Sequence, residues 1–169
     1  MKKVLLLIVA IVSVLHASAQ EVDSLQVQST AVSIDSLSIR LNKLQHDYDF
    51  MFCDFELHKM IMDLKDLSST IDISSERVLI NYYSSRYNHA LYNAYVEDYE
   101  SCRTLFDSLK DKIKATRTVV LVKIALSGFS ELEQNVINAY WGLIDQCVIK
   151  VEKALDYYDV TIDAYRSKR

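Results

Sequence analysis

Proline and glycine are almost missing from this chain of 169 residues, which has no proline and only two glycines, Gly128 and Gly142. An average protein has roughly 5% proline and 7% glycine, and tight turns depend on both residues. Folds built from many short strands and turns are therefore excluded, and long helices with few connections are expected. Because catalytic residues are disproportionately carried on loops, the same scarcity argues against an enzyme.

The residue patterns of common catalytic and cofactor sites are missing as well. Phosphate loops and serine nucleophile elbows need glycines that this chain does not have. The histidines after the first twenty residues, His46, His58 and His89, show no metal-ligand spacing, and the sequence has no C-x-x-C or C-x-x-C-H motif. We therefore expect no cofactor, no bound metal and no catalytic activity.

The N-terminus has the pattern of a cleavable export signal. Lys2 and Lys3 precede an apolar run over residues 4–15, and the small residues 17–19 form a cleavage site. The run has about 12 residues, whereas a membrane span needs about 20. No cysteine follows the cleavage site directly, so a lipoprotein anchor is not expected. The sequence predicts that residues 1–19 are removed and that the protein is periplasmic or extracellular.

The charge of the chain is acidic. The formal net charge is −4, and it becomes −6 when the two lysines of the signal are removed. Binding to nucleic acid phosphates needs a stripe of basic side chains. Nucleic acid is therefore not an expected partner.

Helical spacing of apolar residues continues through most of the chain. The polar stretch 20–32 is expected to be a flexible leader, and residues 33–169 a single helical domain. Over residues 34–62 the apolar positions alternate by three and four, which is the heptad pattern of a coiled-coil seam. A second apolar stripe, over residues 50–71, lies on nearly the opposite side. The later part of the first helix therefore needs more than one partner surface.

The first turn is predicted in the serine-rich segment 68–76, where Ser74 or Ser75 would cap the second helix. A second helix from there to the next turn would have about 52 residues and a length of about 78 Å. It would have to overhang its neighbours or break, and residues 115–118 are the best place for a break. The sequence predicts an all-α antiparallel bundle of three long helices, or four if the second is broken.

The second turn is the best marked in the chain. Gly128 suits a left-handed C-terminal cap, and Ser130 with Glu133 makes the S-x-x-E pattern of a capping box. We therefore expect the last helix to begin at Glu131.

Three cysteines, Cys53, Cys102 and Cys147, lie on the three different predicted helices. In an oxidising compartment cysteines of this kind can pair. Their predicted distances from the turns stagger them along the helices by more than the roughly 7 Å that a disulfide allows between Cα atoms. We expect three buried thiols that pack as small hydrophobic residues, with an intermolecular bond as the alternative.

Six tyrosines occur within residues 80–100. Such rings can fill wide helix seams while each hydroxyl reaches water. They can also form a binding surface, because tyrosine and arginine are enriched at binding hot spots. The candidate surface for a partner protein, a small ligand or a glycan consists of Asn81, Tyr83, Arg86, Tyr87 and Asn88.

The segment 118–126 is apolar all round except for Lys123. One interpretation is a buried short helix or a cap of the bundle. The other is a contact with a partner or with a membrane surface, because unpaired apolar surface marks interaction sites. The candidate contact residues are Val119, Val120, Val122, Ile124 and Phe129.

These patterns favour an exported helical interaction or scaffold module that binds another protein or itself. The alternatives are a small-ligand or glycan binder that uses residues 82–99, and a protein that docks on a membrane surface through residues 118–126.

Overall fold

The computed structural model describes residues 24–169, with side chains from residue 34 onward. Three α-helices follow one another in this part of the chain: α2 (Ser24–Ser84), α3 (His89–Ser127) and α4 (Glu131–Arg166). The predicted signal, residues 1–19, lies outside the described residues. Of the predicted leader, residues 24–32 belong to α2, and its separation from the domain stays a prediction.

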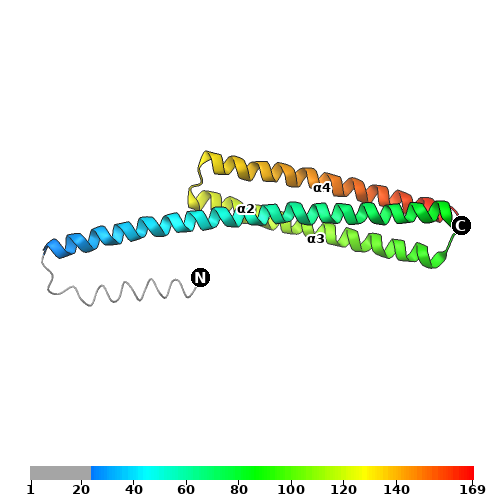
Figure 1. Ribbon diagram of the computed structural model, residues 1–169, viewed down its shortest axis with the longest axis horizontal. Helices are drawn as coiled ribbons and strands as arrows, with labels where there is room; N and C mark the ends of the chain where they lie inside the picture. The colour runs from blue at the N-terminus through cyan, green and yellow to red at the C-terminus, as the bar shows by residue number, and fades with distance from the viewer. Residues whose placement is uncertain (1–23) are drawn as a thin grey trace. The chain divides into compact units, whose positions relative to one another are not determined.

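The described residues fall into two compact units, one ending at Leu44 and the other running from Gln45 to Arg169. Within the second unit α2, α3 and α4 lie side by side, each antiparallel to the helix before it (Figure 1). The connection from α2 to α3 and the end of α4 lie at one end of this bundle, and the connection from α3 to α4 lies at the other. The predicted all-α antiparallel bundle of three helices is confirmed.

The predicted break near residues 115–118 does not occur, because α3 is continuous from His89 to Ser127. The sequence predicts this break only for a second helix that begins near residue 76. In the structure α3 has 39 residues and α4 has 36. The two helices therefore match in length, and the four-helix alternative is wrong.

The turn predicted over residues 68–76 is also wrong, because α2 continues through it. Serine and threonine hydroxyls often compete with helical hydrogen bonds, but they can also bond the carbonyl of the preceding turn. The Ser75 hydroxyl donates to the carbonyl of Ile71 at 2.8 Å, and the Thr70 hydroxyl donates to that of Asp66 at 2.9 Å. The serines of this segment therefore lie within a continuous helix and do not end it.

The connection between α2 and α3 consists of residues 85–88. Asn88 is the N-cap of α3, and its side-chain oxygen accepts from the backbone N–H of Ala90 at 2.9 Å and of Leu91 at 3.3 Å. Asparagine is among the preferred N-cap residues because it satisfies backbone donors that have no helical partner. The tyrosine-rich segment therefore spans a turn.

The connection between α3 and α4 has the predicted structure. Gly128 caps α3 in the left-handed region, with φ 64° and ψ 43°, a conformation that glycine adopts without steric cost. Ser130 and Glu133 form the capping box: the backbone N–H of Ser130 donates to the Glu133 carboxylate at 2.8 Å, and the Glu133 N–H donates to the Ser130 hydroxyl at 3.3 Å. As predicted, α4 begins at Glu131.

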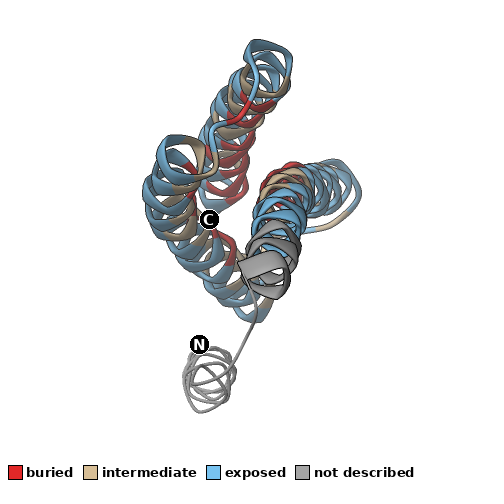
Figure 2. Ribbon diagram, turned by 90° about the vertical axis from the view of Figure 1, so that its left-hand side faces the viewer, coloured by how far each residue is buried: buried red, intermediate tan, exposed pale blue. Residues whose placement is uncertain are grey.

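The core of the bundle combines buried apolar side chains from all three helices. In Figure 2 the buried residues lie on the inner sides of the helices. Cys53 and Cys102 are buried and Cys147 is half-buried, and all three thiols are free. Burial raises the pKa of the Cys53 and Cys102 thiols, so both stay protonated and unreactive. The largest fully buried side chains are Tyr158, Tyr165, Leu57, Met60, Leu64, Ile71, Ile137 and Ile144.

Candidate functional site

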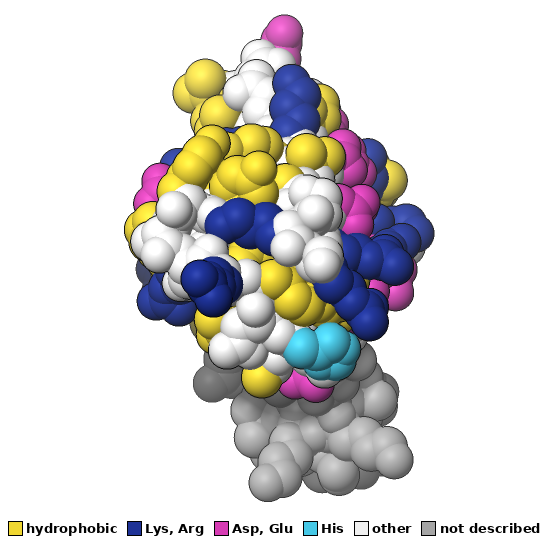
Figure 3. Space-filling view, turned by 90° about the vertical axis from the view of Figure 1, so that its right-hand side faces the viewer, with side chains coloured by type: hydrophobic (Ala, Val, Ile, Leu, Met, Phe, Trp, Pro, Cys, Tyr) yellow, Lys and Arg dark blue, Asp and Glu magenta, His cyan; other side chains and the backbone are white. Residues whose placement is uncertain are grey.

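The tyrosine-rich segment lies at the end of the bundle where α2 meets α3 and where α4 ends. Figure 3 looks onto this end and shows apolar side chains in its middle, with Lys and Arg side chains among and around them. Lys168 contributes to this arrangement by donating to the carbonyl oxygens of Tyr82 and Ser85. These two carbonyls belong to the last turn of α2 and to the residue after it, where helices have carbonyls without helical partners. Lys168 therefore stabilises the end of α2.

Most of the tyrosine rings pack inside the bundle. The partly buried rings that pack against the core are Tyr82, Tyr87, Tyr92, Tyr95 and Tyr99. Tyr165 of α4 joins them: its ring lies 5.7 Å from that of Tyr87 and 5.6 Å from that of Tyr95. Of the six tyrosines, only Tyr83 is exposed, with 81% of its surface accessible. The interpretation in which the rings fill helix seams is confirmed for five of them.

The five residues of the candidate surface lie close together along the α2–α3 connection, but three of them have structural partners. The Asn81 amide donates to the Tyr95 hydroxyl at 2.7 Å, Asn88 caps α3, and the half-buried Tyr87 packs on core rings. Tyr83 and Arg86 are exposed. A binding role for this surface stays a prediction, and it depends on two side chains.

The apolar segment 118–126 is the last part of α3, and the helical period divides its residues between two environments. Val120 is fully buried and Ile124 is half-buried. Phe129, beyond the helix, is buried and packs edge-to-face on the rings of His46 and Phe50. Val120 and Phe129 pack in the core and Ile124 is half-buried, so a contact role for these three residues stays a prediction with little exposed surface to support it.

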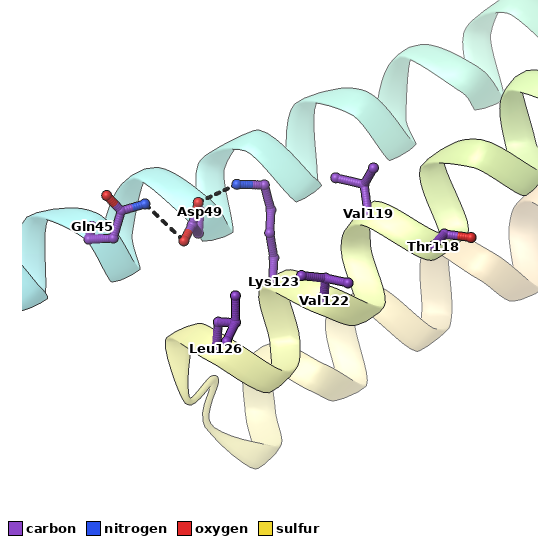
Figure 4. Close-up of a pocket in the computed structure, with 7 residues that line it drawn as sticks. All are labelled: Gln45, Asp49, Thr118, Val119, Val122, Lys123 and Leu126. Carbon is purple, nitrogen blue, oxygen red and sulfur yellow. Dashed lines mark hydrogen bonds and ion pairs between the residues drawn. The ribbon is translucent and has the colours of Figure 1, made fainter. Parts of the chain in front are cut away.

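The two other candidates of this segment, Val119 and Val122, are exposed and line a groove between α2 and α3 (Figure 4). The groove has a volume of about 400 Å³. Its apolar wall comes from α3, where Leu126 lies beside the two valines, and its polar wall comes from Gln45 and Asp49 of α2.

Asp49 and Lys123 form an ion pair at the side of this groove. The Asp49 carboxylate is buried, and it also accepts from the Ser127 hydroxyl at 2.6 Å and from the Gln45 amide at 3.0 Å. Burial alone would raise the pKa of Asp49. The hydrogen bonds from Lys123, Ser127 and Gln45 outweigh burial and lower the pKa to about 2. The ammonium of Lys123 also lies 4.7 Å from the centre of the Phe52 ring.

The chemistry of this pair is structural. A general acid or base needs a pKa near the working pH, and Asp49 remains a carboxylate at every pH at which proteins usually work. Its charge is already balanced by Lys123 and by two further donors. Sequence reasoning missed this pair, although Lys123 is the single charged residue in an apolar run and Asp49 lies next to the heptad position of Tyr48.

One face of α2 exposes large apolar side chains. We name as the outward stripe four exposed apolar residues that share one face of α2 in the second unit: Tyr48, Met51, Phe55 and Met62. Their exposed fractions are 63%, 70%, 63% and 45%. At 3.6 residues per turn, they point nearly opposite to the fully buried residues of the same helix, such as Cys53 and Leu57. The heptad seam predicted from the sequence therefore faces away from the bundle, and the second stripe forms the core.

The outward stripe is bordered on each side by a carboxylate that bonds another helix. Asp49 reaches Lys123 of α3 on one side. On the other side, the Tyr140 hydroxyl of α4 donates to Asp54 at 2.7 Å. This hydrogen bond raises the pKa of Tyr140. The two contacts fix the rotation of α2 about its axis and hold the outward stripe toward solvent.

The unit that ends at Leu44 has apolar residues of the same kind. We name as the N-terminal stripe Ile34, Leu37, Leu41 and Leu44, which are all exposed. In the sequence their spacing of three and four leads directly into that of the outward stripe.

No known protein family matches this chain, and no curated protein and no solved structure is similar to it. Between residues 24 and 169 no helix has the length and apolar character needed to cross a membrane. In the same part of the chain, no group of three or more His, Cys, Asp or Glu side chains could hold a metal ion.

Proposed function

We propose that this protein is an exported helical interaction module that binds a protein partner through α2 and has no catalytic activity of its own. The observation that carries the proposal is the outward stripe, in which four large apolar side chains lie exposed on one face of a helix. A helix that is apolar on both faces needs a partner on each. The core face of α2 has its partners in α3 and α4, so the outward face is available for a second protein.

Two physical arguments support a binding role for this surface. Contiguous exposed apolar patches are uncommon on monomeric soluble proteins and mark interaction sites. Methionine and aromatic residues, of which the outward stripe consists, are enriched at protein interfaces. Export rests on the sequence pattern of residues 1–19.

The rival surfaces have less support. At the tyrosine-rich end Tyr83 and Arg86 are exposed to a ligand or glycan, although the Tyr83 ring also packs edge-to-face on that of Tyr82. The other candidate residues hold the bundle together. The segment 118–126 keeps Val119 and Val122 as exposed candidates for a membrane surface, whereas Val120 belongs to the core.

Site-specific photo-crosslinking in the producing cells tests the proposal. A photoreactive phenylalanine analogue replaces Phe55 in one variant, Tyr83 in a second and Tyr157 in a third. Tyr157 is an exposed aromatic of α4 and serves as the matched control. We expect a protein adduct from position 55 and none from position 157.

The outcomes of this experiment separate the rival surfaces. Adducts from position 83 with none from position 55 would move the binding site to the tyrosine-rich end. Absence of adducts from position 55 under conditions that give efficient photolysis would overturn the proposal.

A further inference from the structure

We propose that the partner of α2 is a second copy of this chain, and that the two α2 helices pair in parallel and in register along the outward stripe. This inference rests on the proposed function, because it names the occupant of the same surface. Two observations carry it: the heptad register and the charges that flank the outward stripe.

The first observation is the heptad register. Tyr48, Phe55 and Met62 occupy the first position of successive heptads, and Met51 occupies the fourth. In the sequence the same register continues into the N-terminal stripe, with Ile34 and Leu41 at first positions and Leu37 and Leu44 at fourth positions. A first-and-fourth apolar repeat is the pattern by which two helices pack knobs into holes.

The repeat has a defined end. The fourth position after Met62 is Lys65, which is a charged residue. Within the heptads of the outward stripe, His58 is the polar residue at a fourth position, and it is exposed. A single polar seam residue can fix the register of a coiled coil at some cost in stability. The apolar repeat therefore ends at a defined residue and contains one polar residue that can fix the register, as expected for helix pairing.

The second observation is the pattern of charges beside the seam. In a parallel pair in register, the seventh residue of one heptad faces the fifth residue of the next heptad on the other chain. This rule places Asp54 opposite Lys59 of the second copy, twice by symmetry. Asp47 falls opposite Phe52, so neither pair joins like charges. The outward stripe is therefore flanked by one pair of complementary charges in this arrangement.

The structure around the outward stripe leaves room for a second helix. The fully buried residues of α2 lie on its opposite face, where α3 and α4 pack. Asp49 and Asp54 bond these helices from the two borders of the stripe, so self-pairing breaks no contact of the core.

Light scattering after size exclusion, on the purified exported chain with reductant present, is the first test. We expect twice the chain mass for the wild type at a concentration of about 100 μM. The variant Met51→Glu/Phe55→Glu should run as a monomer with unchanged helical circular dichroism, and its self-association should be at least about 100-fold weaker because pairing would bury unpaired carboxylates. The matched control, Tyr157→Glu/Val160→Glu, places the same charges at exposed apolar residues of α4 and should remain a dimer.

Disulfide crosslinking tests the arrangement. In a parallel pair in register, the two copies of residue 51 face each other across the seam, so Met51→Cys should form a dimer-sized disulfide under mild oxidation. The control is Glu56→Cys, at the second heptad position, which lies outside the seam. Equal or weaker crosslinking at position 51 than at position 56 would overturn the parallel register.

Different results would overturn the proposed function, which is partner binding through α2, and the inference that this partner is a second copy of the chain. A wild-type chain that is monomeric at 100 μM, or a Met51→Glu/Phe55→Glu variant that stays dimeric, would overturn pairing with a second copy. If the chain is a monomer and position 55 still crosslinks to a different protein in cells, the proposed function stands and only the identity of its partner is wrong. If position 55 gives no adduct, both fail.

Discussion

The two faces of α2 have a similar apolar character but opposite environments. Leu57 and Leu64 are fully buried against α3 and α4, whereas Met51 and Phe55, on the other side of the same helix, are largely exposed. Serines occur on the buried face, as with Ser75, and their hydroxyls return to backbone carbonyls. Hydrophobicity alone therefore does not decide which face of this helix enters the core.

Polar contacts at the borders between the two faces distinguish the inward face of α2 from the outward one. Asp49 is held by Lys123, and Asp54 accepts from Tyr140. Each contact joins α2 to a different helix and fixes which stripe turns inward. Because these contacts keep the outward apolar face exposed, that face is available for assembly. The following substitutions test how far the two faces of α2 differ in their contribution to stability.

The largest contrast is expected between Leu57→Ala and Phe55→Ala. Leu57→Ala removes fully buried methyl groups and leaves a cavity, so it should lower the free energy of unfolding by about 2–5 kcal/mol. Phe55→Ala should change the stability of the monomer by less than about 0.5 kcal/mol, because the residue is exposed. Urea unfolding at low and high protein concentration measures both. A loss at Phe55 that equals the loss at Leu57 at low concentration would erase the distinction between the faces.

The border at Asp49 should have the next largest effect, and the effect should depend on pH. The pKa of Asp49 is lowered from 3.8 to about 2, so its contribution is fully present above the unfolded value and is lost as the pH falls through the folded value. Asp49→Asn should therefore cost about 2 kcal/mol at pH 7 and nearly nothing at pH 2. The test is urea unfolding of both proteins across this range. A difference between them that stays constant with pH would contradict the assignment.

The border at Asp54 should have the smallest effect. Tyr140→Phe removes the hydroxyl that donates to Asp54 and keeps the ring, so it should lower the free energy of unfolding by about 1 kcal/mol. Tyr157→Phe serves as the control, because Tyr157 is exposed on the same helix, and it should leave stability unchanged. Equal stabilities of the two variants would show that this hydrogen bond does not help to orient α2.

The sequence predicted one connection of the bundle and missed the other, for local reasons. Gly128 is the preferred residue for a left-handed helix cap, and Ser130 with Glu133 forms a capping-box pattern, so these residues mark their turn in the sequence. Residues 85–88 contain neither glycine nor proline, and their one signal is Asn88, an N-cap residue within a run of tyrosines. The serines of residues 68–76 resemble a turn, but hydroxyl bonds to the preceding helical turn keep them in α2.

Misplacing that turn also limited what could be predicted of the candidate site. Both apolar stripes of α2 follow from spacing alone, yet the choice of the inward stripe depends on contacts such as Asp49 with Lys123, whose residues are 74 positions apart. The lone charge of Lys123 in an apolar run signals that it needs a partner, but a single sequence does not show which carboxylate supplies it. The structural roles of Asn81 and Tyr87 in the tyrosine-rich surface were unpredictable for the same reason, because both residues acquire their partners only when the chain folds back at residue 85.

For a protease that cuts after basic residues, the bundle has one weak point. The two connections, residues 85–88 and 128–130, contain a single basic residue, the exposed Arg86. Cleavage after Arg86 would separate α2 from α3 and α4 in covalent terms only, because the core draws on all three helices. The nicked protein should therefore remain a folded complex of two fragments, and α2 could then be exchanged or labelled as a separate peptide.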